Sequence, residues 1–276
     1  MRKIDIVSFN AFGAPFHPAN ILRTFLRTRV RKRFRILAKK TKQENIDILV
    51  LQEVHTYVHL RTLRTLLPEY RYVIFKKFLF GPRGGLVIFS KTPLLFETYI
   101  DFQKKGVLWN KSITGPLSKK GILIAKALKT QLTIINTHLT QNSDHDWSTS
   151  NRYTFFLVSQ LNQLASLIKT LKKTNRKLIV CGDFNMPKHV SLYSSFMKKS
   201  GLIDVFQSET SPTHHKVYMG KKLSSGRIDY IFTTELKPLA TDHIFTRKVT
   251  IDNSIQEFLS DHIGLRARFQ LHYSQA

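Results

Sequence analysis

Five short polar clusters, each at or just past the end of an apolar run, constrain this chain more than any other feature. They read SFN at Asn10, LQE at Glu53, NTHL at His138, GDFN at Asp183 and Asn185, and LSDH at Asp261 and His262. Short apolar runs are typical of strands, and rigid strands hold side chains on adjoining loops within the tolerance that catalysis requires. The clusters therefore predict one functional site built from strand ends.

Hydrophobic periodicity predicts many strands and a few helices. The predicted strands are Lys3–Phe9, the run IDILVLQE, Arg71–Phe75, Gly85–Phe89, Ile122–Leu128, Leu132–Thr137, Lys177–Cys181, Arg227–Phe232 and Leu265–Leu271. The predicted helices are Ile21–Gln43, Leu60–Leu67, Tyr153–Leu171 and Ser191–Lys199. Many strands with interspersed helices fit two packed sheets covered by helices, which is a four-layer α/β sandwich.

The length and composition favour a single domain. A chain of 276 residues, 42% of them hydrophobic, can bury a substantial core. No repeat, linker or low-complexity tract divides the sequence. We therefore predict one catalytic domain that spans residues 1–276 and acts as a monomer.

The chain is strongly basic, with 44 Lys and Arg against 18 Asp and Glu and a net charge of +26. Ten of the basic residues lie between Arg23 and Lys42, in the predicted helix Ile21–Gln43, and no acid lies among them. A positive surface attracts polyanions, so nucleic acid and an anionic membrane are both natural partners. The alternative is a charged surface that is only solvated.

Cysteine usage and hydropathy give a first expectation about location. Cys181 is the sole cysteine, so no intramolecular disulfide can form and no oxidising compartment is needed. Asp5 and Asn10 interrupt the N-terminal apolar stretch before it could serve as a signal peptide. No window offers about 18 uninterrupted apolar residues. We expect a cytoplasmic or peripheral membrane protein without a transmembrane span.

Four carboxylates stand beside apolar strands in a chain that has few acids. They belong to Glu53, Asp183, Asp229 and Asp261. A carboxylate next to an apolar core needs a partner, and a divalent cation is the simplest one. A metal site is therefore expected where these residues meet.

In their order along the chain, the motifs resemble the endonuclease/exonuclease/phosphatase superfamily, which has the deoxyribonuclease-I-like fold. The resemblance covers essentially the whole chain and rests on Asn10, Gln52-Glu53, Asn136-Thr137-His138, Gly182-Asp183-Phe184-Asn185, Arg227-Ile228-Asp229-Tyr230 and Ser260-Asp261-His262. It implies a four-layer αββα sandwich of two packed, mostly antiparallel sheets.

Segments between these motifs are most similar to the neutral and bacterial sphingomyelinases. They are GGLVIFSKTPL, LSKKGILIAK, CGDFNMP, SLYSSFMKKSGLIDVF and GRIDYIF. The long hydrophobic membrane-binding hairpin of the secreted bacterial members has no counterpart that we can place in this sequence. That difference bears on the substrate and not on the chemistry.

The resemblance makes Glu53 the principal ligand of Mg²⁺, with Mn²⁺ as a possible substitute. A carboxylate beside the amide oxygen of Asn10 suits a hard, oxygen-preferring ion. Asp261 is expected to reach the metal or its water shell. The alternatives are that Glu53 is a helix N-terminal acid and that Asn10 is an ordinary turn residue.

His262 is the expected general base, because hydrolysis needs a group of near-neutral pKa to take a proton from the attacking water. Asp229 would orient the imidazole and stabilise its charged form. By resemblance, Asp183 orients the nucleophile or assists the leaving group. His138 is expected to donate a hydrogen bond to the phosphate; a lone histidine at a strand end is more often a core or capping residue.

Asn185 is expected to donate to a phosphoryl oxygen. In an extended segment, Asp183 and Asn185 would point to one side and Phe184 to the other, so both polar side chains could meet one phosphate. The alternative is an ordinary Gly-Asp-x-Asn turn.

Two further groups of polar residues look like metal sites but lack the ligand spacing of a zinc site. They are His214-His215 and Asp144-His145-Asp146. We interpret both as solvated loops near the rim of the site, and replacement of His214 or His215 is expected to have little effect.

Together these features predict a Mg²⁺-dependent phosphodiesterase that uses metal-assisted in-line attack of water. A sphingomyelinase-like phospholipid hydrolase is the first hypothesis, and its substrate contact is a phospholipid headgroup. The alternatives are an endonuclease or exonuclease acting on nucleic acid, and a phosphoinositide phosphatase. A catalytically inactive binding module is a fourth hypothesis, against which the intact polar set argues.

Overall fold

The computed structural model describes residues 2–13, 29–104, 119–174, 177–218, 226–252 and 255–271. The first sheet contains β11 (Pro238–Ile244), β14 (Gly264–Leu271), β1 (Arg2–Asn10), β2 (Ile48–Gln52), β4 (Val87–Ser90) and β3 (Tyr72–Ile74), in that order. The second contains β5 (Leu95–Asp101), β6 (Gly121–Ala127), β7 (Leu132–His138), β8 (Lys177–Asp183), β10 (Asp229–Thr233) and β9 (Ile203–Asp204). A separate ribbon pairs β12 (Val249–Asp252) with β13 (Ile255–Glu257).

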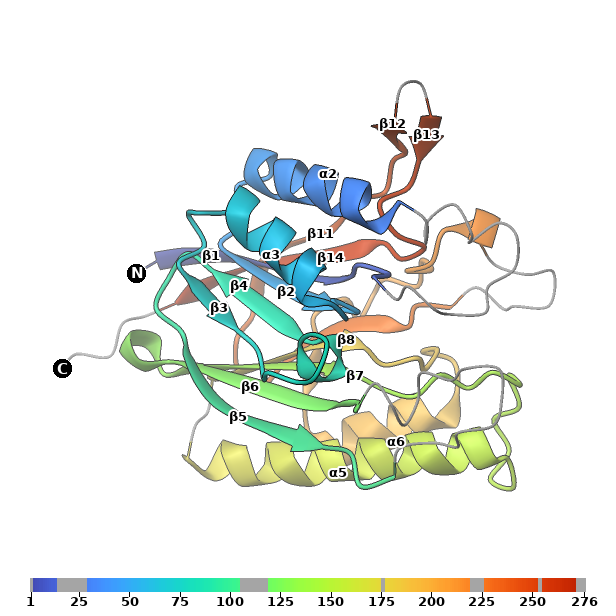
Figure 1. The fold of residues 1–276 in the computed structure, drawn as a ribbon. Coiled ribbons are helices and arrows are strands. Elements are labelled where there is room, and N and C mark those ends of the chain that lie inside the picture. Colours follow the sequence, from blue (N-terminus) through green and yellow to red (C-terminus); the bar gives the residue numbers. More distant parts are fainter. Residues whose placement is uncertain are drawn as a thin grey trace.

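The two sheets face each other, and helices cover their outer faces (Figure 1). Helices α2 (Val30–Gln43) and α3 (Tyr57–Leu66) lie on the first sheet, and α5 (Arg152–Thr174) and α6 (Ser191–Ser200) lie on the second. One apolar cluster fills the space between the sheets, and two others join each sheet to its helices. Only the pairs β1–β2 and β7–β8 run parallel among the described strands of the two sheets. The predicted four-layer, mostly antiparallel sandwich is confirmed.

Most of the predicted elements are present, with shifted ends. Helix α3 begins at Tyr57, earlier than predicted, because the Thr56 hydroxyl accepts a hydrogen bond from the His59 backbone at 3.2 Å and caps the helix. Of the predicted helix Ile21–Gln43, residues 21–28 lie outside the described residues, and α2 accounts for the rest.

Several strands were not predicted, and three short 3₁₀ helices join the described elements. The missed strands are β5, β9, β11, β12 and β13. The 3₁₀ helices are η1 (Arg83–Gly85), η2 (Leu128–Thr130) and η3 (Lys216–Tyr218). β5 and β11 lie at edges of their sheets and are largely exposed, so they lack the apolar pattern that marks an inner strand.

Strand pairing brings the polar clusters to one edge of the sandwich. In the first sheet, Asn10 lies opposite Gln52 at the ends of β1 and β2. In the second, Asp183 lies opposite both His138 and Asp229. Because each parallel pair ends at the same edge, residues from distant parts of the sequence meet there.

None of the described helices is both long and apolar enough to cross a bilayer.

Candidate active site

Asp183 is the residue on which the other polar side chains converge. Its Oδ2 accepts a hydrogen bond from Asn10 Nδ2 at 3.0 Å and lies 3.4 Å from His138 Nε2 and 3.7 Å from His262 Nε2. Burial and the negative charge of Asp229 raise the pKa of this carboxyl to about 7. The site therefore holds a carboxylate whose ionised form depends on nearby positive charge.

Backbone geometry fixes Asp183 at this point. Gly182 has a φ of 146°, and a Cβ there would lie 1.9 Å from the Thr137 carbonyl oxygen. No other residue could bring β8 this close to β7. The close approach explains why glycine precedes the aspartate in the GDFN motif.

His262 and Asp229 form the predicted dyad. His262 Nδ1 donates to Asp229 Oδ2 at 2.8 Å, and both side chains are buried. Burial alone lowers the pKa of His262, but the charges of Asp229 and Asp183 outweigh it and raise this pKa to about 10. Thr213 Oγ1 accepts the backbone N–H of Asp229 at 3.1 Å, which fixes the orienting carboxylate. The dyad leaves Nε2 of His262 facing Asp183.

Glu53 and Asn10 form the side of the site that belongs to the first sheet. Asn10 Nδ2 donates to Glu53 Oε1 at 3.2 Å as well as to Asp183, so two carboxylate oxygens converge on one point. Converging oxygens of this kind are what a hard divalent cation requires. The residues present therefore fit the expected metal.

The amide of Asn10 is turned the opposite way from our prediction. Its Oδ1 accepts the Phe12 N–H at 3.0 Å, and its nitrogen faces the carboxylates. The amide NH₂ thus supplies the donor that the two neighbouring carboxylate oxygens share. Direct ligation through Oδ1 would require the amide to rotate.

Asp261 lies beside the dyad. Candidate ligand atoms of His214, Asp261 and His262 lie within 4.8 Å of one another, and so do those of Asp183, Asp229 and His262. Ser260 Oγ donates to the Asn10 carbonyl at 2.7 Å, and this bond ties the loop of Asp261 to β1. The loop thus links the dyad to the expected metal side.

His138 and Asn185 lie beside Asp183. Burial and the positive charge of Lys120 hold the pKa of His138 well below its ordinary value, so this imidazole is neutral. Asn185 donates to the Leu139 carbonyl at 3.0 Å, and its φ of 49° is left-handed. The prediction of an extended Asp183–Asn185 segment is therefore wrong, and a turn brings Asn185 to the site.

Lys120 is a site residue that sequence reasoning missed. Its Nζ donates to the Leu139 carbonyl oxygen at 2.7 Å, the same oxygen that Asn185 uses. Burial lowers its pKa to about 8, while the charges of Asp183 and Glu53 act in the opposite direction. Hydrophobic periodicity does not single out Lys120; its position directly before β6 was the available signal.

His214 is the second missed residue, and the interpretation of His214-His215 as solvated is wrong. The Nε2 atoms of His214 and His262 lie 2.8 Å apart, and the two backbones form a short antiparallel bridge. His215 is buried and stacks on Phe258 with ring centroids 3.6 Å apart. The expectation that this segment lies near the site is confirmed. The exposed loop of Asp144, His145 and Asp146 agrees with its interpretation.

Two buried amide side chains and one buried guanidinium stabilise the edge of the sandwich at which the candidate site lies. Gln52 Nε2 donates to Asn136 Oδ1 at 2.8 Å across the two sheets, and Asn136 Nδ2 donates to the Leu51 carbonyl at 2.9 Å. Arg33 donates to the backbone carbonyls of Ala11, Phe12 and Leu259. One cation of the basic helix is thus used inside the fold.

Comparison with solved structures supports the fold. Beta toxin from Staphylococcus aureus matches with a TM-score of 0.70 and 17% identity, over 96% of this chain and 99% of that chain. Sphingomyelinase C from Streptomyces griseocarneus matches with a TM-score of 0.68 and 15% identity, over 97% and 99%. Truncated TDP2 from Caenorhabditis elegans matches with a TM-score of 0.66 and 17% identity, over 97% of each chain. At these identities the likeness concerns the fold alone.

Sequence comparison identifies the family. No curated protein sequence matches the chain. The model of the Endonuclease/Exonuclease/phosphatase family matches residues 7–262, which is most of the chain and includes every predicted site residue. The chain therefore belongs to the endonuclease/exonuclease/phosphatase family and is a metal-dependent phosphoric ester hydrolase.

Proposed function

We propose that this protein is a Mg²⁺-dependent phosphodiesterase of the sphingomyelinase type. The observation that carries the proposal is the buried dyad of His262 and Asp229, in which the second imidazole nitrogen of His262 lies 3.7 Å from Asp183, one of the two carboxylates that converge on Asn10. Mn²⁺ is expected to replace Mg²⁺, because both prefer oxygen ligands.

In the proposed mechanism, the neutral form of His262 accepts a proton from the attacking water at Nε2, and Asp229 stabilises the resulting imidazolium through Nδ1. The positive charge of bound Mg²⁺ would lower the raised pKa of His262 toward the range that this step needs. Asp183 orients the water or assists the leaving group. Glu53, with Asn10 and Asp261, would hold Mg²⁺, which supplies charge neutralisation at the phosphate when it is bound.

Three donors would face the phosphoryl oxygens. Neutral His138 and the amide of Asn185 donate hydrogen bonds, and the ammonium of Lys120 adds a positive charge at the same carbonyl that orients Asn185. Donors that are already fixed in place stabilise charge as it develops, so they act mainly on the transition state.

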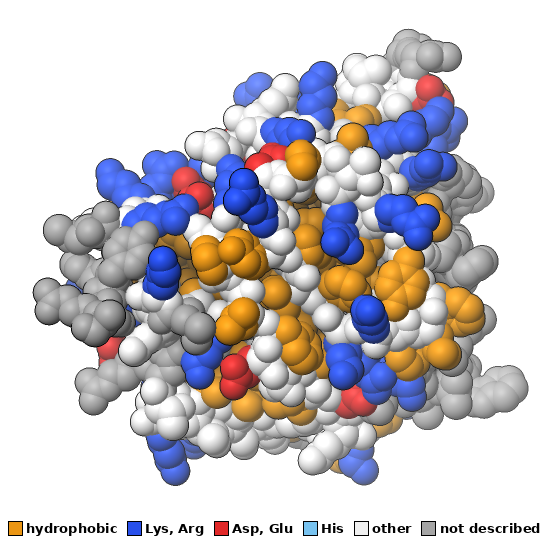
Figure 2. Space-filling model, turned by 60° about the vertical axis from the view of Figure 1, so that its left-hand side comes forward, with side chains coloured by type: hydrophobic (Ala, Val, Ile, Leu, Met, Phe, Trp, Pro, Cys, Tyr) orange, Lys and Arg blue, Asp and Glu red, His pale blue; other side chains and the backbone are white. Residues whose placement is uncertain are grey.

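A phospholipid headgroup is the proposed substrate contact, and an exposed apolar turn near the site supports it. Leu79 and Phe80 are 73% and 79% exposed, and Lys76 and Lys77 precede them. Gly81, at the end of the turn, packs against the His55 carbonyl, two residues from Glu53. Figure 2 shows hydrophobic side chains gathered among Lys and Arg on the face that it presents. Such a surface suits peripheral association with an anionic membrane.

Hydrolysis of nucleic acid is the second candidate function. The net charge of +26 would neutralise phosphates along a polyanionic backbone. One of the TDP2 structures with a similar fold, from Danio rerio, was solved in complex with a single-strand DNA product. A phosphoinositide phosphatase remains a third hypothesis. In each case, the proposal is a monomeric domain spanning residues 1–276 that works in the cytoplasm or at a membrane surface.

The test measures hydrolysis of sphingomyelin vesicles, plasmid DNA and phosphoinositide vesicles, each with Mg²⁺ and with a chelator. The proposal expects turnover of sphingomyelin that requires metal and is lost in His262→Ala. Metal-dependent cleavage of DNA alone would favour the nuclease. Turnover that persists after metal removal would contradict the phosphodiesterase mechanism itself.

A further inference from the structure

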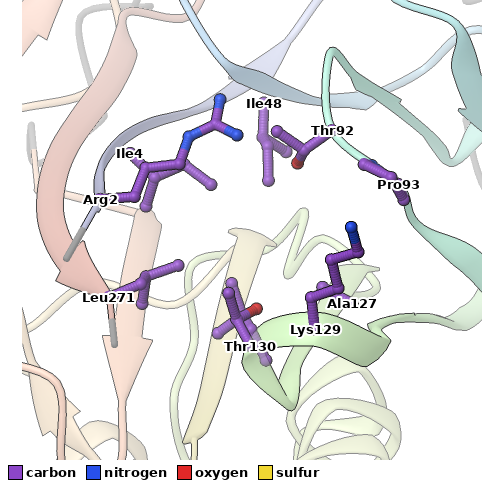
Figure 3. Close-up of a pocket in the computed structure, with 10 residues that line it drawn as sticks. Arg2, Ile4, Ile48, Thr92, Pro93, Ala127, Lys129, Thr130 and Leu271 are labelled. Atoms are coloured by element: carbon purple, nitrogen blue, oxygen red, sulfur yellow. The ribbon is translucent and has the colours of Figure 1, made fainter. Parts of the chain in front are cut away.

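The end of the sandwich opposite the candidate active site contains a cavity of about 330 Å³ between the two sheets (Figure 3). Its inner wall consists of aliphatic side chains that are at most 4% exposed: Ile4, Ile48, Leu132 and Leu271. They lie near the starts of β1, β2 and β7 and at the end of β14. The volume is at the lower end of the range of about 300–1,000 Å³ that is typical of small-molecule sites.

Two cations stand at the rim of this cavity: Arg2 at the start of β1, and Lys129 in η2, which joins β6 to β7. Figure 3 shows the Lys129 ammonium directed toward the cavity and the Arg2 side chain along its edge. Arg2 lies 3.6 Å from Asp47 in a pair that is partly exposed, and such pairs contribute little. Lys129 has no acidic partner among the residues that the structure describes. The rim therefore favours an anion.

Thr130 supplies an independent sign of a missing polar partner. It lines the cavity and is 9% exposed, and its hydroxyl has no hydrogen-bond partner among the described residues. A buried hydroxyl without a partner costs about 1–3 kcal/mol, so such groups are uncommon unless a ligand or water completes them. A bound acceptor would remove this cost.

We propose that the cavity binds a small amphiphilic anion, a carboxylate with a short saturated chain. The carboxylate would lie at the rim, where Arg2, Lys129 and Thr130 offer donors, and the chain would lie against Ile48 and Leu132. A nucleotide or a sugar does not fit, because the inner wall offers no polar groups to pair with its many hydroxyls. The proposal does not depend on the phosphodiesterase activity.

Binding at this position should stabilise the fold. Strands β2 and β7 begin at the cavity with Ile48 and Leu132, and their far ends carry Gln52 and His138. A ligand that binds only the folded state stabilises it by RT ln(1 + [L]/Kd), so the melting temperature rises with ligand concentration. Stability is therefore a readout that does not involve turnover.

The experiment titrates the full chain with octanoate and follows the melting temperature and the methyl NMR signals of Ile4, Ile48, Leu132 and Leu271. Saturable shifts confined to these methyl groups, with a rise in melting temperature, are expected. Octanol, which has the chain without the charge, and acetate, which has the charge without the chain, should each bind at least tenfold more weakly. Equal binding of octanol would overturn the anionic site, and the absence of methyl shifts would overturn the cavity site.

Variants separate the contributions of the wall and the rim. Ala127→Phe fills the cavity and should abolish the shifts, and the double variant Arg2→Gln with Lys129→Gln should weaken octanoate but not octanol. Thr130→Val should raise the melting temperature of the free protein and weaken octanoate binding. Lys169→Gln, on the exposed face of α5, is the control and should change nothing. Undiminished octanoate binding in the double variant would contradict the proposal.

Discussion

The two sheets have the same arrangement but contribute different chemistry to the candidate active site. Each has six strands around one central parallel pair, β1–β2 in the first and β7–β8 in the second. The first pair ends at Asn10 and Gln52, next to Glu53, the proposed principal ligand of the metal. The second ends at His138 and Asp183, next to Asp229, and the proposed roles of these residues are proton transfer and contact with the phosphate.

Under the proposed roles, one strand arrangement serves two tasks because only the terminal residues differ. The hydrogen bond from Asn10 Nδ2 to Asp183 Oδ2 joins the two halves directly. The hydrogen bond from Gln52 to Asn136 also joins the two sheets and helps to fix the distance between them. Substitutions on the metal side and on the proton-transfer side of the site should therefore lower turnover in different ways.

The largest expected losses of turnover come from two variants, one that tests proton transfer and one that tests metal binding. His262→Ala should lower turnover by about 10²–10⁴-fold at every Mg²⁺ concentration, because it removes the general base. Glu53→Gln should lower turnover too, but part of the loss should return at high Mg²⁺. Steady-state rates across a Mg²⁺ titration measure both effects.

His145→Ala, in the exposed loop, is the matched control for loss of an imidazole. Circular dichroism and melting temperature should confirm that each variant folds. Recovery of His262→Ala at high Mg²⁺, to the same extent as Glu53→Gln, would show that the two halves do not divide the work as described.

The helices that cover the two sheets differ in charge density, and this difference should decide binding to polyanions. Arg31, Arg35 and Lys39 are exposed on α2 at intervals of four residues, so they form one stripe. Lys32 is not part of this stripe, because it pairs with Asp252. Reversal of the three stripe residues to Glu should weaken binding to anionic vesicles by about 100-fold or more at low salt, since each cation contributes about 1 kcal/mol.

The control for the stripe lies on the other side of the molecule. Lys169→Glu, Lys173→Glu and Lys198→Glu make the same charge change on α5 and α6. Sedimentation with vesicles at low and high salt measures binding, and the stripe effect should shrink as salt screens it. Equal losses in both triple variants would mean that net charge alone attracts the membrane and that α2 has no special part.

The sequence predicts the parts of this site that follow from strand ends. Asn10, Glu53, His138 and Asp183 follow strong apolar runs, and strand pairing alone brings them to one edge. The fold class was predictable for the same reason, since the inner strands carry unambiguous patterns.

The missed residues depend on tertiary contacts that no local pattern encodes. His214 lies in a loop whose place is fixed when the neighbouring Thr213 accepts the backbone N–H groups of Ile228 and Asp229. Lys120 reaches the site because β6 pairs with β7, and the carbonyl that it contacts belongs to Leu139. Asn185 reaches it through a left-handed turn. None of these positions follows from hydrophobic periodicity.

The pH dependence of the free energy of unfolding of the metal-free protein should show how the charges around His262 and Asp183 affect stability. The pKa of His262 is raised from its ordinary value of 6.5 to about 10, so its contribution is fully present below pH 6.5 and is lost as pH rises toward 10. The raised pKa of Asp183 acts in the same direction, between its ordinary value of 3.8 and about 7. Unfolding by urea, measured from pH 5 to pH 10 with a chelator present, should therefore show declining stability.

Asp229→Asn tests whether the charge of Asp229 causes the raised pKa of His262. It removes the negative charge that raises the pKa of His262 most, so the decline above pH 6.5 should become shallower. NMR titration of the His262 ring should show its pKa falling toward the ordinary value. An unchanged ring pKa in Asp229→Asn would mean that Asp229 positions the ring without stabilising its charge.

The smallest expected effect concerns His214, the residue that lies closest to the working nitrogen of His262. With Nδ1–H of His262 donating to Asp229, the two Nε2 atoms, 2.8 Å apart, share one proton. His214→Ala removes one hydrogen bond worth about 0.5–1.5 kcal/mol, while Asp229 still orients the base. Turnover should therefore fall by about two- to tenfold, far less than in His262→Ala, and the acidic limb of the pH–rate profile should move. His214→Asn should restore part of the rate, because an amide can donate or accept at a similar position. If His214→Ala leaves both the rate and the pH profile of wild type, the contact has no part in the reaction, and the dyad of His262 and Asp229 works without it.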